Sequence, residues 1–331
     1  MDIRKVEHRE FLHIIVIFLA AQFAGLFLAT QLFSGQTFQE IQGAQSASAL
    51  SGSIDYALYV IALIIGFSLI MILITKLYKG AKLLYVIESV VIFGAAFFAF
   101  ATLLSSLFNY IGLQNNAATQ GDLLISAVVL SIAVIAIKNI VPRTRNYVTI
   151  LISAGVGLIW GYNFGFITTY ILFAILAVYD VIAVFITKHM VTMANAMIGK
   201  NLTFMVQVGD VQALPERDVM QKNAKYVRDM DRMAKSDSFT KDIRKQKMVP
   251  VPVGNALGTG DIVIPMALAI SAYTVNLNFV LSLFIIFGAL LGFVMLFFIL
   301  NRMKRMLPAL PPLLFGCTIG MAAYFLLYIV L

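Results

Sequence analysis

Three acidic residues lie inside strongly apolar stretches of the sequence, where a charge is costly and usually marks a functional position. They are Glu88, Asp180 and Asp261. Glu88 lies six residues past Lys82, close enough to the end of its stretch to reach the membrane interface or to pair with a lysine. We therefore expect Glu88 to be structural, and we take Asp180 and Asp261 as the candidates for chemistry.

Asp180 and Asp261 occupy consecutive apolar stretches and are predicted to lie at similar depths. Asp180 is eight residues before Lys188, or ~12 Å along a helix that rises ~1.5 Å per residue. Asp261 lies about ten residues, or ~15 Å, into a stretch that begins near residue 251. The two stretches run in opposite directions, so both depths are counted from the same side. If the two helices touch, the carboxylates can face each other.

Two facing carboxylates in a site of low dielectric constant share one proton. The ionised one can act as a general base on water, while the protonated one donates to a substrate carbonyl oxygen. This is the chemistry of an aspartic protease, and it needs no metal or cofactor. The paired-acid ion site of a transporter or cation channel is the alternative. Gly258 and Gly260 let a substrate backbone approach Asp261 closely, but a transporter site benefits equally, so the spacing leaves both open.

The counts of cysteine and histidine exclude several other chemistries. Cys317 is the one cysteine, so an internal disulfide and a cysteine-rich zinc site are excluded. The three histidines are His8, His13 and His189, and none forms the H-E-x-x-H pattern of a zinc protease. A serine protease would have only His13, near the end of the first apolar stretch, as its base. We therefore predict that no metal and no cofactor takes part.

The composition is that of a membrane protein with several spans. Of the 331 residues, 61% are hydrophobic and 12% are charged, and the mean hydropathy is +0.92. A soluble domain is about 45–50% apolar and about 25% charged. The continuous apolar runs favour helices over the alternating strands of a β-barrel. We predict an all-α polytopic protein with nine transmembrane helices, at roughly 11–33, 54–75, 83–108, 123–140, 147–165, 166–187, 251–273, 279–300 and 308–331.

The basic residues predict the direction of these spans. All 24 lysines and arginines fall on alternate connections, or on the span ends beside them. By the positive-inside rule, the N-terminus is cytoplasmic and the C-terminus lies outside. We therefore predict a multi-pass protein of the cell membrane. The net charge of +8 is explained by this topology, so we expect a lipid bilayer and no nucleic acid as partner.

The sequence divides into three parts. Residues 1–187 form a six-span bundle that ends with Asp180, residues 188–250 form a largely flexible basic cytoplasmic loop, and residues 251–331 form a three-span part. The run from Val249 to Val253 contains two prolines, which exclude a regular helix and favour extended backbone. It is either a stiff entry to the seventh span or an edge on which an extended peptide can pair. Glycines at four-residue spacing in three spans predict close helix packing.

Three short motifs, in this order and on these spans, resemble the signatures of the presenilin and signal peptide peptidase family of intramembrane aspartyl proteases. They are Tyr179-Asp180 in the sixth span, Gly258-Thr259-Gly260-Asp261 in the seventh, and Pro308-Ala309-Leu310-Pro311 at the start of the ninth. The resemblance covers the whole chain in topology but only about a dozen residues by motif. The short loops and the cytoplasmic N-terminus make the chain most similar to a microbial, archaeal presenilin homologue.

The resemblance implies a presenilin-like fold and an endopeptidase that cuts peptide bonds within the transmembrane helices of substrate proteins. Asp180 and Asp261 would be its catalytic pair. Tyr179, Gly258, Gly260, Pro308, Ala309 and Leu310 would shape the site and bind substrate. The eukaryotic enzyme of the family works with partner subunits, whereas microbial relatives generally act without them. The sequence itself demonstrates no partner subunit and leaves a homo-oligomer open.

Overall fold

The computed structural model describes residues 3–33, 82–112, 117–141, 144–186, 205–208, 211–215, 248–252, 255–274, 279–303 and 307–330, with isolated residues between 59 and 66. Eight α-helices lie within these ranges: α1 (Ile3–Phe33), α4 (Lys82–Ile111), α5 (Ala117–Ile140), α6 (Arg145–Asn163), α7 (Phe166–Val181), α11 (Thr259–Thr274), α12 (Phe279–Met303) and α13 (Leu310–Val330). They fall on eight of the nine predicted spans. The span predicted at 54–75 lies almost wholly outside the described residues, so the count of nine stays a prediction.

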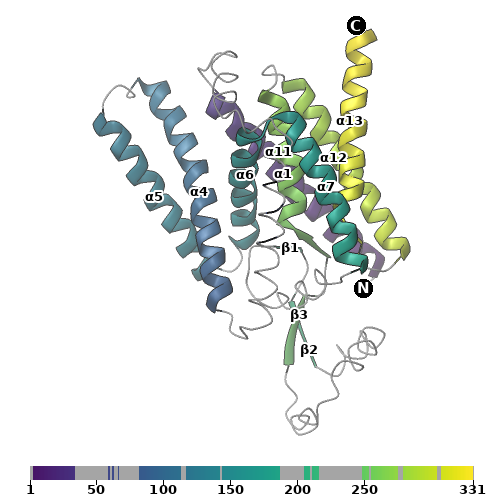
Figure 1. Cartoon of the computed structure of the whole chain (residues 1–331). Coiled ribbons are helices and arrows are strands. Elements are labelled where there is room, and N and C mark those ends of the chain that lie inside the picture. The colour runs from purple at the N-terminus through teal and green to yellow at the C-terminus, as the bar shows by residue number, and fades with distance from the viewer. Residues whose placement is uncertain are drawn as a thin grey trace.

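The helices have the length and composition of membrane spans. Within the described residues, six apolar segments are long enough to cross a bilayer: Phe11–Phe33, Tyr85–Ile111, Gly121–Ile140, Phe166–Ile186, Phe279–Leu300 and Leu310–Tyr328. The protein is therefore an integral membrane protein with several spans. Helix α1 begins at the end of the bundle where the strands lie, and α13 ends at the opposite end (Figure 1). Which end faces the cytoplasm stays a prediction.

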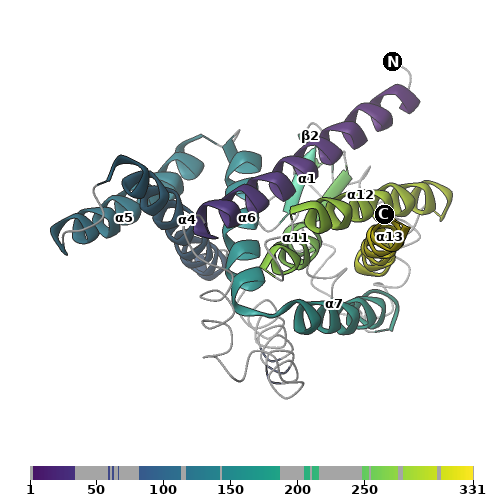
Figure 2. The same ribbon diagram turned by 90° about the horizontal axis from the view of Figure 1, so that it is seen from above.

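Helix α11 is the centre of the bundle. It packs against α1, α6, α7, α12 and α13, and the view along the bundle shows these helices around it, with α4 and α5 set to one side (Figure 2). Nearly all of its side chains are buried, from Ile262 to Thr274. A helix that is apolar on every side belongs in the interior. Asp261 therefore belongs to the most enclosed helix of the fold.

The predicted close approach of helices at glycine positions is confirmed, except at Gly165, where an added Cβ would meet no atom within 4 Å. Gly157 and Gly161 of α6 lie directly against Met266 and Ile270 of α11, where an added Cβ would sit 2.5 and 2.6 Å from their side chains. The contact between α12 and α13 is tighter. There, the backbone at Gly288 faces the carbonyl of Gly316, so the two helices approach at van der Waals distance of their backbones. This contact fixes α13, which carries the Pro308-Ala309-Leu310 segment at its start.

The seventh predicted span begins later than the sequence indicates. Instead of a helix from 251, residues Met248–Pro252 form strand β3 and Asn255–Gly258 form strand β4, and α11 begins only at Thr259. The alternating valines and prolines are apolar enough for a span, but proline does not fit a helix interior. The predicted extended backbone is confirmed, and Asp261 lies in the first turn of α11 rather than ten residues along a helix.

Four short strands form two separate two-stranded sheets. Strand β4 pairs antiparallel with β1 (Met205–Val208), and β3 pairs antiparallel with β2 (Val211–Pro215). Strand β1 packs against α1 and α6, with Val206 completely buried. The segment predicted as a flexible loop thus contains β1 and β2, and the remainder of 188–247 lies outside the described residues. The pair of β1 and β4 anchors the chain immediately before Asp261.

Glu88 is paired, one of the two placements that its position allowed. Its Oε2 accepts a hydrogen bond of 2.6 Å from Nζ of Lys138 on α5, and both side chains are almost fully buried. Lys138 also lies over the ring of Tyr85, and Arg145 at the start of α6 adds a second attractive charge. This ion pair connects α4 to α5.

We predict that Lys138→Met destabilises the protein, because it leaves the buried Glu88 carboxylate without its ion-pair partner. Breaking one side of a buried ion pair costs about 3–5 kcal/mol. The double variant Glu88→Gln/Lys138→Met should recover most of this loss. Thermal unfolding in detergent, followed by circular dichroism, measures both. A Lys138→Met variant as stable as the unmodified protein would contradict the structural role.

Candidate active site

Asp180 lies in the last turn of α7, at a point where the helix changes its winding. Residues Ile182–Ile186 form a short π-helix, η2, and the amide of Ile182 donates to the carbonyls of Val178 and Tyr179. Such π-helical turns within helices are found frequently at functional sites. The carboxylate itself is buried, with 3% of the residue exposed.

The start of α13 provides a donor for this carboxylate. The backbone N–H of Leu310 donates to Oδ2 of Asp180 over 3.1 Å. Leu310 is the first residue of α13, so its N–H is one of those left without a partner inside the helix. The positive end of the helix dipole also lies at this point. The Pro308-Ala309-Leu310 segment therefore contacts Asp180 directly through its backbone.

A second polar contact fixes α13 against α7. The hydroxyls of Tyr170 and Thr318 lie 3.0 Å apart, several turns away from Asp180. Together with the hydrogen bond from Leu310 to Asp180, this contact joins α7 and α13 at two points along their length. The register of Asp180 against the first turn of α13 is thus defined by two polar contacts as well as by packing.

Asp261 lies in the first turn of α11, directly after β4. It is partly buried, and it lies close enough to Asp180 for the two carboxyl groups to interact electrostatically. Helices α7 and α11 are in contact. The two acids thus come from neighbouring antiparallel helices, as the sequence predicted, but Asp261 lies at the start of α11 and not ten residues along it.

The two glycines beside Asp261 differ in their surroundings. A Cβ at Gly258 would sit 3.1 Å from Oδ2 of Asp261, whereas a Cβ at Gly260 would meet no atom within 4 Å. Gly260 is exposed. The space beside Asp261 is therefore closed on the side of Gly258 and open on the side of Gly260.

The remaining predicted site residues surround the two acids to different degrees. Pro308 and Leu310 are buried, while Tyr179 and Ala309 are partly buried. Among the described residues, no group of three metal-binding side chains is found. One polar residue that the sequence reasoning passed over, Gln22 of α1, donates from Nε2 to the carbonyl of Ile262 over 2.9 Å. A glutamine inside a long apolar stretch is the sequence signal that would have indicated it.

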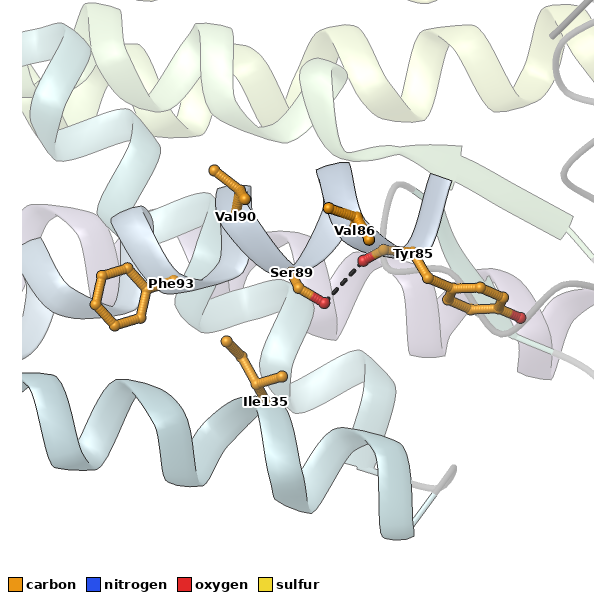
Figure 3. A pocket seen from close by; sticks show the side chains of 6 residues that line it. All are labelled: Tyr85, Val86, Ser89, Val90, Phe93 and Ile135. Atoms are coloured by element: carbon orange, nitrogen blue, oxygen red, sulfur yellow. Dashed lines mark hydrogen bonds between the residues drawn. The ribbon is translucent and has the colours of Figure 1, made fainter. Parts of the chain in front are cut away.

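A shallow groove lies away from the two acids. It is lined by Tyr85, Val86, Ser89, Val90 and Phe93 of α4 and by Ile135 of α5 (Figure 3). The Ser89 hydroxyl in this groove donates to the carbonyl of Tyr85 in the same helix. The groove therefore offers an apolar surface and no carboxylate for chemistry.

Comparison with solved structures gives the fold. A solved chain described as a presenilin family intramembrane aspartate protease, in space group P2, matches with a TM-score of 0.58 and 21% identity, over 96% of this chain and 97% of that one. A second, in space group C222, matches with a TM-score of 0.55 and 21% identity, over 94% and 95%. The architecture is thus presenilin-like. No curated protein matches the chain.

Comparison with protein families gives the assignment. The profile described as "Signal-peptide peptidase, presenilin aspartyl protease" matches residues 15–330. This match includes Asp180, Asp261 and the segment at Leu310 that the structure brings together. The chain therefore belongs to the signal-peptide peptidase and presenilin family of aspartyl proteases.

Proposed function

We propose that the protein is an intramembrane endopeptidase that hydrolyses peptide bonds within the transmembrane helices of substrate proteins, using Asp180, Asp261 and one water. The observation that supports this proposal most directly is that Asp180 lies in the last turn of α7 and Asp261 in the first turn of α11, on two helices that are in contact. Family membership supports the same reaction class. Because these helices are apolar along their length, the substrate bond reaches the acids from within the bilayer.

The two acids have different surroundings, which favours different roles. Asp180 accepts the N–H of Leu310 at the positive end of α13, an arrangement that stabilises negative charge. We assign it the general base that removes a proton from water. Asp261, in its protonated form, donates to the carbonyl oxygen of the scissile bond. The water oxygen bonds to the carbonyl carbon to give a tetrahedral intermediate. The C–N bond then breaks as Asp180 passes its proton to the departing amine and Asp261 takes a proton back from the intermediate, which leaves a new carboxyl terminus and a new amino terminus.

The substrate must lose its helical hydrogen bonds before this reaction can occur. A transmembrane helix hides its peptide bonds in internal hydrogen bonds, so a local extended segment has to form near Asp261. Among the described residues, the sheet of β1 and β4 has two strands, and β4 leads directly to Asp261. An extended substrate segment can pair with a strand edge of this kind, which would deliver its backbone to the acids.

We predict that Gly260→Ala lowers cleavage without lowering stability, because its Cβ meets nothing in the free protein and fills the open side next to Asp261. The matched control is Gly94→Ala on α4, an exposed helical glycine that also has no atom within 4 Å of the added Cβ. Alanine is favoured over glycine in a helix by roughly 1 kcal/mol, so neither variant should unfold. Initial rates on a single-span substrate, with thermal unfolding alongside, compare the two. Equal rates for both variants would argue against substrate approach past Gly260.

The proposed function is tested by incubating the purified, reconstituted protein with a panel of single-span substrates and identifying the products by mass spectrometry. We expect cuts inside the apolar segment and inhibition by a transition-state analogue of aspartic proteases. The paired acids also fit the alternative of a transporter or cation channel. Ion flux into vesicles that requires Asp180 and Asp261, without any proteolysis, would favour that alternative and exclude the protease. Activity of the purified chain alone would also show that it needs no partner subunit.

A further inference from the structure

Gln22 connects α1 to the turn that carries Asp261. The residue is 0% exposed, and its Nε2 donates to the carbonyl oxygen of Ile262 over 2.9 Å. Ile262 is the residue directly after Asp261 in the chain. A hydrogen bond to this carbonyl therefore fixes the peptide group on the C-terminal side of the acid.

The first turn of α11 is deficient in hydrogen bonds of its own. Pro265 lies inside the helix, and proline has no N–H to donate to the carbonyl four residues earlier, which is that of Asp261. The turn also follows directly on an extended strand, so no preceding helix supports it. Gln22 donates to the next carbonyl, that of Ile262, so it does not replace the missing bond but adds a contact from α1 to the same turn.

The helices on both sides of α11 bring further polar atoms to the same level. Gly25 of α1 and Gly157 of α6 both lie against Met266, and both helices run in the same direction as α11. One turn before these glycines are Gln22 and Ser153, which are therefore level with the first turn of α11. In the described part of the chain, Oε1 of Gln22 and Oγ of Ser153 are buried without a hydrogen-bond partner.

Such atoms are unfavourable for stability. A buried polar atom without a partner costs about 1–3 kcal/mol, which offsets the gain from the hydrogen bond to Ile262, so an apolar side chain of similar size at position 22 would cost the fold little or nothing. Departures of this kind from good packing are expected at functional sites. The Gln22 side chain that bears this cost is bonded to Ile262, the residue next to Asp261. This indicates that the Gln22 amide serves the site rather than the fold.

We infer that Gln22 is a positioning residue, which orients the Asp261 carboxylate through its hydrogen bond to the Ile262 carbonyl. The inference rests on the proposed function and adds a residue outside the three motifs. Without the bond, the first turn of α11 shifts, and the Asp261 carboxylate moves relative to Asp180 and to the substrate carbonyl. Small misplacements of a catalytic group lower the rate of the chemical step, while substrate binding elsewhere is unchanged.

The test compares two buried side chains that donate to different carbonyls of α11. Gln22→Met keeps the length of the side chain and removes the donor to Ile262. Ser282→Ala removes a donor to the Ala269 carbonyl, a buried bond of 2.7 Å about two turns further along the helix. We expect Gln22→Met to keep or raise the unfolding temperature, to lower kcat by about 10- to 100-fold and to leave KM unchanged. We expect Ser282→Ala to lower the unfolding temperature and leave kcat unchanged.

Each other outcome overturns the inference. If Gln22→Met cleaves at the normal kcat, the bond does not position Asp261. If Gln22→Met does not fold, the amide is required for the fold instead. If Ser282→Ala loses as much kcat as Gln22→Met, the effect belongs to α11 packing in general. Asp180→Asn and Asp261→Asn in the same assay separate this from the proposed function, which fails only if the unmodified protein does not cleave or if these variants do.

Discussion

Asp180→Asn and Asp261→Asn should each reduce cleavage of a transmembrane substrate by at least about 10²–10⁴-fold, the usual contribution of a general acid or base. Asparagine has the shape of aspartate but neither accepts nor releases the proton that the reaction moves. Initial rates with purified, reconstituted protein measure the effect. Neither variant should be less stable. At position 180 the amide oxygen still accepts the Leu310 N–H, and either change puts a neutral amide of the same size in place of one of the two acids.

The matched control for these variants is Asp122→Asn, at an exposed position on α5. It replaces a carboxylate by an amide in the same way, but at a position away from α7, α11 and α13. We expect normal cleavage in this variant. Substantial cleavage by Asp180→Asn or Asp261→Asn would exclude the two-aspartate mechanism, whatever the control shows.

Leu310→Pro should lower kcat by about 10- to 100-fold, because it removes the N–H that donates to Asp180. A hydrogen bond to a charged group contributes about 1.5–3 kcal/mol, which corresponds to this loss at about 1.4 kcal/mol for each factor of ten. The fold should tolerate the change. Leu310 is the first residue of α13, and proline is favoured at the first position of a helix because the N–H there has no helical partner.

Leu310→Ala separates the backbone donor from the buried side chain. Both variants lose most of the apolar contact of Leu310, but only the alanine variant keeps the N–H. Rates measured on one substrate under one condition should therefore be clearly higher for Leu310→Ala than for Leu310→Pro. If the two variants are equally impaired, the side chain of Leu310 matters and its N–H does not.

Much of the helical arrangement was predictable because lipid imposes a simple rule on the sequence. Long apolar runs become helices there, and α4, α12 and α13 lie close to their predicted limits, whereas α1 begins eight residues earlier than predicted. The placement of Asp180 and Asp261 followed from the antiparallel order of consecutive spans. The contact of Leu310 with Asp180 was implied only by the family resemblance, since nothing in the spacing relates residues 130 positions apart.

Other features depend on long-range partners that a single sequence does not reveal. The pairing of Val206 with Leu257 joins strands about fifty residues apart, and it explains why the helix at Asp261 begins at Thr259. The choice of Lys138 as the partner of Glu88, and of Ile262 as the partner of Gln22, also depends on how helices pack in three dimensions. Apolarity alone did not distinguish strand from helix between 248 and 258.

The proximity of the two acids can be measured by cross-linking cysteines at positions 180 and 261. The single native cysteine, Cys317, is first replaced by alanine, so that the double variant Asp180→Cys/Asp261→Cys has only the two new thiols. Oxidation in membranes should join them, since a disulfide needs Cβ atoms only about 3.5–4.5 Å apart, and the pair Tyr179→Cys/Asp261→Cys should react more slowly. If the 180–261 pair stays reduced while the 179–261 pair is joined, the two carboxylates do not face each other and the proposed mechanism is wrong.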